Sequence, residues 1–344
     1  MINELKKFLD TIEIFLADRI ALVSHELDYD SSLLKTVYQE LVCLGILRFM
    51  VPIDQGGFGG GRLDWIEYNI KMAQYSGALL FLQAQHQFAV SQLKKLLPDK
   101  KAQDVLQSIV KNNNGLGIAI AANRKILQVK MHDNGFFVSG TLLWVTGHGF
   151  FPKIVFSFDY ENTVYYTLLP FHPVKDSLTV SKNRETFVFG STHSVSLTLH
   201  DYFIPKNEII ASEPFKLKIP VEHPAIYNFA GAALALLKMT MHEKYNVYPD
   251  TTIVRDRLLN EWHVYYKRII QGNYDPFALR ADGLQFAEKC LLFAKIVCGS
   301  NGLLSSHPVT RISREIWQYS MAGYSKDQFE AYLNIIYEVK NEAS

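Results

Sequence analysis

The spacing of apolar residues changes twice along the chain, and these changes most restrict the folds available to it. Residues 1–113 carry apolar side chains three and four positions apart, as amphipathic helices do. Between about 116 and 212 they alternate or form short β-branched and aromatic runs, separated by turns such as Asp133-Asn134-Gly135. Helical spacing returns after Pro214 and Pro220. The order helices, sheet, helices lacks β-α-β alternation, which argues against a doubly wound nucleotide-binding fold.

These three segments predict an α+β protein with three domains. We expect an N-terminal helical domain over 1–115, a middle antiparallel β-sheet domain over 116–215 and a C-terminal helical bundle over 216–344. Asp30 and Ser31 are placed to cap the second helix. Further helices are expected over 64–97, 101–110, 224–247, 252–271, 276–297 and 327–339, with a loop over 299–308.

Composition excludes several classes of protein. The 35 basic and 34 acidic residues give a net charge of +1, without the basic excess that a nucleic-acid partner requires. Charged residues interrupt the first 23 positions, unlike a signal peptide, and the most apolar stretch, 229–237, is too short for a membrane span. The three scattered cysteines suit a reducing compartment, so we expect a cytoplasmic protein. The near-zero net charge favours self-association.

Common catalytic motifs are missing. The glycines of 56–61 follow a helix and lack a Gly-Lys-Ser/Thr ending, so they predict a helix connection rather than a phosphate loop. The 11 histidines form no HExxH or HxH pair, and we expect no metal site. No GxSxG elbow surrounds Ser191-Thr192-His193-Ser194, which argues against a nucleophilic triad.

Four stretches, in this order along the chain, together resemble the acyl-CoA dehydrogenase family. They are VPIDQGGFG at 51–59, GFFVSGTLLWVT at 135–146, the strand-like segment 190–210 that ends in DYFIPKNEII, and 299–315 with its GSNG, Pro308-Val309, Arg311 and Arg314-Glu315. The resemblance spans nearly the whole chain and implies the family's helical, β-sheet and helical domains. It also implies an FAD cofactor, an acyl-CoA or acyl-carrier substrate, and a homodimer or homotetramer.

The resemblance suggests which residues contact the cofactor. It assigns Trp144, Val145, Thr146 and Thr192 to the FAD site, with Trp144 packing beside the flavin ring and Thr146 hydrogen-bonding near N5 and O4. Flavin supplies an electron sink that protein side chains lack. The alternative for Trp144 is an ordinary buried aromatic of the sheet.

The chain also departs from the family's pattern. At 118–123, IAIAAN stands where the family has T-E-P and a G-S-D loop, and Tyr248-Pro249-Asp250 interrupts the region of its R-x-x-F-G segment. The family's glutamate base precedes a glycine, but Ala322 occupies that position here, and an alanine cannot abstract a proton. The second position that the family uses falls near Ala225. The remaining candidates for a base are Glu222, His223 and Tyr324.

Three hypotheses remain open. The chain is a divergent flavin oxidoreductase acting on CH–CH groups or in a related oxidation, a catalytically inactive binding or assembly subunit that has lost FAD, or a true acyl-CoA dehydrogenase with a displaced base. Aromatic residues of the C-terminal helices fit either an interface between subunits or an intramolecular core: Tyr265, Tyr266, Tyr274, Phe277, Phe286 and Phe293.

Overall fold

A computed structural model of the chain describes residues 2–120, 127–215, 222–242, 244–246, 251–323 and 325–336. The chain divides into two compact units. Unit 1 comprises Met1–Ile14, Leu27–Gly61 and Ala78–Leu217, and unit 2 comprises Phe15–Glu26, Arg62–Gly77 and Lys218–Ser344. The division into three domains at 115 and 215 stays a prediction.

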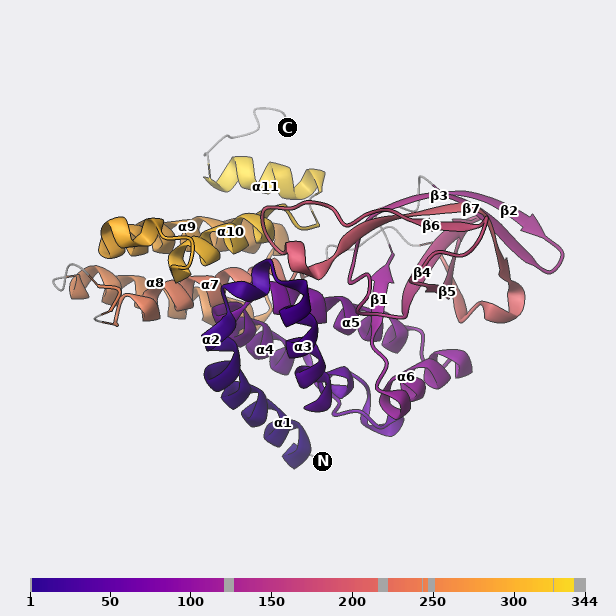
Figure 1. The fold of residues 1–344 in the computed structure, drawn as a ribbon, viewed down its shortest axis with the longest axis horizontal. Coiled ribbons are helices and arrows are strands. Elements are labelled where there is room, and N and C mark those ends of the chain that lie inside the picture. Colours follow the sequence, from indigo (N-terminus) through magenta and orange to yellow (C-terminus); the bar gives the residue numbers. More distant parts are fainter. Residues whose placement is uncertain are drawn as a thin grey trace. The chain divides into compact units, whose positions relative to one another are not determined.

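The helical part of unit 1 is anchored by polar side chains that satisfy backbone groups. It contains α1 (Ile2–Phe15), α3 (Ser31–Cys43), α5 (Gly77–Lys95) and α6 (Lys100–Asn112) (Figure 1). The Asp30 carboxylate accepts hydrogen bonds from the amides of Ser32 and Leu33, both 2.9 Å, which confirms its predicted role as the cap of α3. The fully buried His86 of α5 donates from Nε2 to the carbonyl of Leu47 and accepts at Nδ1 from the amide of Leu116.

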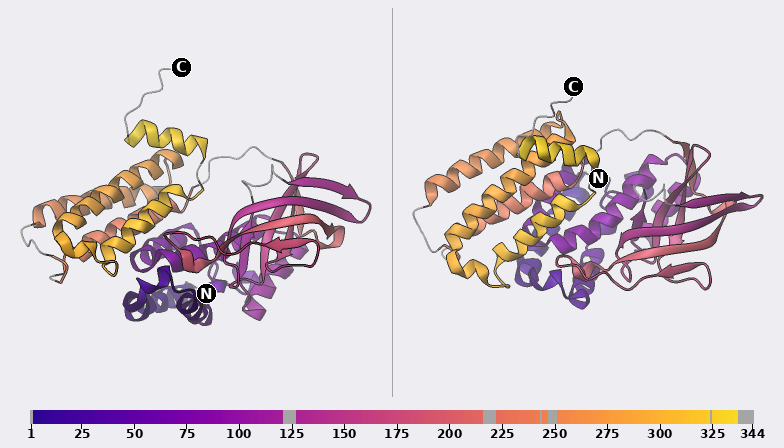
Figure 2. Two further views of the ribbon diagram at one scale, coloured as in Figure 1. Left: turned by 45° about the horizontal axis from the view of Figure 1, so that its top comes forward. Right: turned by 90° about the horizontal axis from the view of Figure 1, so that it is seen from above.

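The β part of unit 1 consists of two four-stranded sheets (Figures 1 and 2). One has the order β1-β4-β5-β8, with β1 (Leu116–Ala119), β4 (Lys153–Tyr160), β5 (Thr163–Pro170) and β8 (Ala211–Pro214). The other has the order β2-β3-β7-β6, with β2 (Gln128–His132), β3 (Gly135–Thr146), β7 (Ser194–Pro205) and β6 (Leu178–Val180). The α+β prediction is confirmed, but β1 pairs with β4 in parallel, whereas the other strand pairs of these sheets are antiparallel.

Aromatic side chains connect the two sheets. The buried ring of Phe136 on β3 lies 5.2 Å from that of Phe158 on β4 and 4.7 Å from that of Tyr165 on β5, measured between centroids. These tilted and edge-on contacts are typical of well-packed aromatic pairs. They fix β3, which carries the predicted cofactor segment, against the neighbouring sheet.

Unit 2 is helical. Its first part holds the π-helical turn η1 (Leu16–Ile20), α2 (Ala21–Val23) and α4 (Arg62–Tyr75). Its larger part holds α7 (Ala225–Met239), α8 (Thr252–Gln271), α9 (Pro276–Cys298), α10 (Pro308–Met321) and α11 (Lys326–Ile336) (Figure 1). The α7 helix packs so closely on α4 that a Cβ on Gly231 would come within 2.5 Å of the Ile70 carbonyl oxygen. Only glycine permits this approach.

Unit 2 differs from the sequence prediction at α7, which was expected over 224–247 and ends at Met239, and at two further places. The helix expected over 64–97 is interrupted at Ser76, because the Gly77 amide donates to the carboxylate of Glu315 on α10, at 2.9 Å, instead of continuing the ladder of α4. Glu315 itself pairs with Arg311 at 2.6 Å, and both side chains are buried. The helix α10, to which the sequence analysis assigned no element, thus carries a buried ion pair that defines the end of α4.

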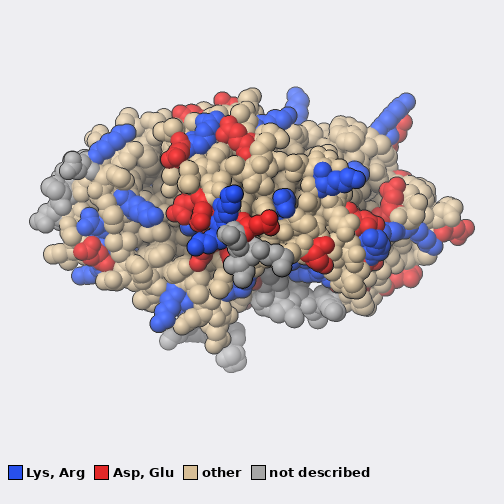
Figure 3. Space-filling model, turned by 90° about the horizontal axis from the view of Figure 1, so that it is seen from below, with Lys and Arg blue, Asp and Glu red and all other residues tan. Residues whose placement is uncertain are grey.

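The described surface is of mixed charge and carries no spanning segment. No helix among the described residues is both long and apolar enough to cross a membrane. On the face drawn in Figure 3, basic and acidic side chains of the described residues are interspersed. The mixture of charges on this face agrees with the net charge of +1.

Candidate functional site

The segment predicted to face the cofactor lies at a β-bulge. Leu142 pairs with Leu197 and Val145 with Val195, so Leu143 and Trp144 on β3 together oppose the single residue Ser196 on β7. Trp144 has a φ of 60°, in the left-handed region, and its side chain is 60% exposed. A bulky residue in this conformation is an outlier, and such outliers often occur at functional sites. The alternative of a buried sheet aromatic is therefore wrong.

A cation covers the Trp144 ring. The guanidinium carbon of Arg184 lies 4.4 Å from the indole centroid, which is a cation–π contact. Arg184 follows β6, and its Nη2 donates to Ser196 Oγ at 2.8 Å. Ser196, which opposes the bulge, thus also binds Arg184, which packs on the Trp144 ring.

Val145 and Thr146 turn inward. Val145 is 2% exposed, and Thr146 is 3% exposed, with its Oγ1 2.8 Å from the Oγ of Ser194. Either hydroxyl can be the donor of this bond. When Ser194 donates, Thr146 keeps its own proton for a second acceptor, so the pair does not use up the hydrogen-bonding capacity of Thr146.

Thr192 belongs to a buried turn. Its side chain is inaccessible to solvent, and its hydroxyl donates to the carbonyl of Phe189 at 2.8 Å. The neighbouring Ser191 hydroxyl donates to the Leu27 carbonyl at 2.6 Å. This bonding gives the Thr192 side chain a structural role in the turn, and its predicted contact with a cofactor stays a prediction.

Within unit 2, the two positions to which the resemblance assigns the family's base lie close together. A Cβ built on Gly323 would lie 2.7 Å from Nε2 of His223. Gly323, which follows Ala322, therefore faces His223, which precedes Pro224. The buried Arg280 of α9 donates from Nη2 to the carbonyls of Tyr319, Ser320 and Ala322, which close the end of α10. This region holds an imidazole and a guanidinium, and it is where the resemblance places the family's carboxylate.

The His223 imidazole is neutral and carries its hydrogen on Nε2. Desolvation, and then the positive charge of Arg280, lower its pKa to about 3. The Ala225 amide donates to Nδ1 at 3.1 Å, so Nδ1 is an acceptor and the neutral ring is protonated at Nε2. The ring therefore presents a hydrogen-bond donor at Nε2, where a base would need a lone pair.

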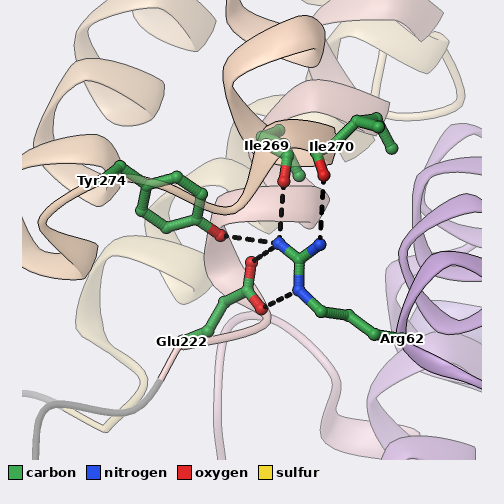
Figure 4. A network of polar contacts seen from close by, with 5 residues as sticks. All are labelled: Arg62, Glu222, Ile269, Ile270 and Tyr274. Carbon is green, nitrogen blue, oxygen red and sulfur yellow. Dashed lines mark hydrogen bonds and ion pairs between the residues drawn. The ribbon is translucent and has the colours of Figure 1, made fainter.

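Glu222 is held in an ion pair (Figure 4). Arg62, at the start of α4, donates from Nη2 to Oε1 at 2.6 Å and from Nε to Oε2 at 2.8 Å. The same guanidinium donates to the carbonyls of Ile269 and Ile270 at the end of α8, and to the Tyr274 hydroxyl. Both carboxylate oxygens are thus engaged in a bidentate contact that joins three segments of unit 2.

A second neighbour confirms that Glu222 stands in a structural network. Burial, then the charge of Glu222 and a hydrogen bond to it, raise the pKa of the Tyr227 hydroxyl well above 10. Tyr227 therefore stays protonated at physiological pH and donates to the carboxylate. The Glu222 carboxylate is thus already occupied by hydrogen bonds from Arg62 and Tyr227, which makes it an unsuitable base.

Several predicted positions lie outside the described residues. These are Tyr324, residues 121–123 of the stretch 118–123 that was compared with the family's T-E-P and G-S-D elements, and 248–250, where the resemblance places the family's R-x-x-F-G segment. Within the described ranges, no group of three or more His, Cys, Asp or Glu side chains could hold a metal ion.

Comparison with solved structures identifies the fold. Butyryl-CoA dehydrogenase from Megasphaera elsdenii superposes with a TM-score of 0.73 at 14% identity, over 97% of this chain and 98% of that one. Glutaryl-CoA dehydrogenase from Mycobacterium smegmatis gives a TM-score of 0.74 at 14% identity, over 98% and 96%. The chain has the acyl-CoA dehydrogenase fold.

The acyl-CoA dehydrogenase fold also occurs in a nitrososynthase from Micromonospora carbonacea var. africana, with a TM-score of 0.74 at 12% identity over 96% of each chain. No protein-family model and no curated protein sequence matches this chain. These similarities show the fold, and the low identities leave the reaction to be argued from the residues.

Two arginines of this acyl-CoA dehydrogenase fold could not be identified from the sequence. Arg184 lies between β6 and β7, outside the segments that carry the resemblance, and Arg280 lies on α9 among apolar residues. Neither stands in a short motif, because each acts on a segment that is distant in sequence. An arginine is seldom fully buried in a helix unless its charge has a partner.

Proposed function

We propose that this chain is a flavin-dependent oxidoreductase whose reaction does not use a carboxylate base. The observation that carries the proposal is Trp144, an exposed indole on a left-handed backbone next to the Thr146–Ser194 hydroxyl pair. An exposed aromatic face suits the stacking of a planar heteroaromatic ring. A bound flavin would supply an acceptor for hydride or electrons.

Of the residues that the resemblance assigns to the cofactor, the exposed Trp144 supports the proposal most directly, since Val145, Thr146 and Thr192 are buried. Trp144 would stack against isoalloxazine, Thr146 would donate a hydrogen bond to its edge, and Val145 would keep the bulge anchored in the sheet core. Thr192 would support the turn beside Ser194. We propose FAD as the form of the flavin.

The choice against ordinary acyl-CoA desaturation rests on unit 2. Ala322 has no ionisable group, His223 presents a donor, and Glu222 is paired with Arg62. Desaturation requires a group that removes the α-proton, whereas an oxidation that begins with an already acidic or electron-rich substrate does not. A nitrososynthase shares this fold with butyryl-CoA dehydrogenase, which supports a scaffold with more than one reaction.

The first alternative is a catalytically inactive subunit. It is favoured by the same three positions, Ala322, His223 and Glu222. Arg280 contacts the Ala322 carbonyl and Arg62 binds Glu222, so arginines lie where a base is expected. The second alternative is a true acyl-CoA dehydrogenase that acts on an acyl-CoA or acyl-carrier substrate with a displaced base, for which Tyr324 remains the candidate.

We also propose a homodimer or homotetramer through the C-terminal helices. A surface groove of about 830 Å³ lies along α8 and α9 and includes Val264, which is 63% exposed. On α9, Leu292 is 62% exposed and Ile296 is 61% exposed. The aromatic Tyr265 and Phe293 are instead buried within unit 2, so the exposed aliphatic residues would form the interface. A cytoplasmic location remains a prediction.

A single set of spectra separates the hypotheses. The purified protein is mixed with FAD, passed through a desalting column and examined for retained flavin absorption. We expect retained flavin that an external reductant bleaches and oxygen restores, without bleaching by acyl-CoA. Bleaching by an acyl-CoA under anaerobic conditions would support the true dehydrogenase, and a folded protein that retains no flavin would support the inactive subunit.

A further inference from the structure

The backbone at Trp144 does not by itself fix the direction of the indole ring. The residue stands at a bulge, where two residues of β3 oppose one residue of β7, and its ring extends into solvent. Without a neighbour, such a side chain samples several rotamers, and ordering it on ligand binding lowers the affinity. A ring that is to stack on a ligand therefore benefits from a group that holds it in advance.

Arg184 is placed to hold the ring. Its guanidinium lies 4.4 Å from the indole centroid and is anchored at Nη2 by Ser196 Oγ. Its own amide donates to the Ser194 carbonyl at 2.9 Å, and the Ser196 amide donates to Ser181 Oγ at 2.9 Å. The arginine is thus connected to the same strand that pairs with the bulge, through contacts that do not involve the indole.

The contact leaves much of the indole open. Arg184 covers one face, yet the Trp144 side chain remains 60% exposed, so the opposite face and the edges of the ring are accessible. The Nε atom of Arg184 is buried and has no acceptor among the described residues. The arginine therefore serves as a backing for the indole.

We infer that Arg184 is a positioning residue that holds the Trp144 indole as a one-sided platform on which the isoalloxazine ring of the flavin stacks. This inference rests on the proposed function. It assigns the open face of the indole to the ligand and the covered face to the protein. Arg184 does not touch the reacting atoms and acts through Trp144 alone.

The test is flavin binding by matched arginine variants. Apoprotein is titrated into FAD, and the quenching of flavin fluorescence gives the Kd of the wild type, Arg184→Met and Arg48→Met. Arg48 is the control because it forms the same kind of contact, 4.6 Å from the Phe58 centroid, elsewhere in unit 1. Loss of a cation–π contact corresponds to roughly threefold to thirtyfold in an equilibrium constant. We expect that increase in Kd for Arg184→Met only.

A second measurement observes the indole directly. The chain has four tryptophans, and fluorotryptophan labelling gives four ¹⁹F signals, of which Trp144→Phe identifies one. Arg184→Met is expected to shift and narrow the Trp144 signal toward that of a mobile ring and to leave the other three unchanged. An unchanged Trp144 signal would overturn the positioning role of Arg184.

The outcomes distinguish the inference from the function on which it rests. If the wild type binds FAD and Arg184→Met binds it equally well, the platform is refuted while the flavin-dependent function stands. If Arg48→Met weakens binding as much as Arg184→Met, the effect is general destabilisation and the inference is wrong. If the folded wild type binds no flavin, the proposed function fails and the platform has no flavin to carry.

Discussion

The ion pair between Arg62 and Glu222 predicts an asymmetric response to mutation. Glu222→Gln removes the charge but keeps an oxygen that accepts a hydrogen bond, and both side chains are partly exposed, at 40% for Arg62 and 21% for Glu222. Screening by solvent limits the expected loss to about 1 kcal/mol of unfolding free energy. Arg62→Ala also removes the contacts to the carbonyls at the end of α8 and to Tyr274. Its expected loss is about 2–3 kcal/mol.

The double variant determines how much of this loss belongs to the pair itself. We expect a coupling energy of about 1 kcal/mol between Arg62 and Glu222 from the cycle of single and double variants. Urea denaturation monitored by circular dichroism gives the four unfolding free energies. Flavin affinity is measured in parallel, and we expect Glu222→Gln to leave it unchanged.

Two results would refute this interpretation of Glu222. A Glu222→Gln variant as stable as the wild type would mean that Arg62 does not need the carboxylate. A loss of about 100-fold or more in substrate-dependent flavin reduction, with stability intact, would identify Glu222 as a general base. Either result would reopen the choice of base.

The remaining predictions concern stability. Burial lowers the pKa of His86 from 6.5 to about 4. The contribution of the neutral His86 to the unfolding free energy is therefore complete above pH 6.5 and is lost as the pH falls from 6.5 toward 4, by about 3 kcal/mol at most. His86→Gln should flatten this part of the pH–stability profile in urea titrations. Gly231→Ala forces a Cβ against the Ile70 carbonyl and should lower the unfolding free energy by about 1–3 kcal/mol, whereas Gly190→Ala, which meets no atom closer than 3.8 Å, should not. Arg311→Met removes the counter-charge of the buried Glu315 and should lower stability by about 3–5 kcal/mol, a loss that adding Glu315→Leu should partly reverse in thermal melts.

Local patterns predicted much of the fold. The change from helical to alternating spacing located the β segment, Asp30 was identified as a cap from its position alone, and the four motif-like stretches indicated the acyl-CoA dehydrogenase fold. Helix α8 begins and ends where the spacing predicted. These features depend on residues close together in sequence, which a single sequence displays directly.

The differences arise from contacts between distant residues. The break between α4 and α5 depends on the Gly77 amide meeting Glu315, and the parallel pairing of β1 with β4 depends on a crossover of more than 30 residues. Strand periodicity is the same in parallel and antiparallel sheets, so the spacing could not distinguish them.

The candidate site was predictable only in part. The motif at 135–146 singled out Trp144, but its exposure results from a bulge that the alternation of β3 did not reveal. Arg280 could not be predicted as a neighbour of Ala322, because the hydrogen bond to the Ala322 carbonyl joins α9 to the distant end of α10. A missing glutamate can be seen in a sequence, whereas the residues that take over its surroundings come from other helices.

The central claim is that the scaffold binds flavin at Trp144 but lacks a base for desaturation. Anaerobic titration of the FAD-loaded protein, first with an acyl-CoA and then with a chemical reductant, tests it most directly. We expect an unchanged flavin spectrum after the acyl-CoA, full bleaching by the reductant and rapid recovery on admission of oxygen. Bleaching by the acyl-CoA would contradict the claim that no base is present, and a folded protein that cannot be loaded with FAD would contradict the claim that the site binds flavin.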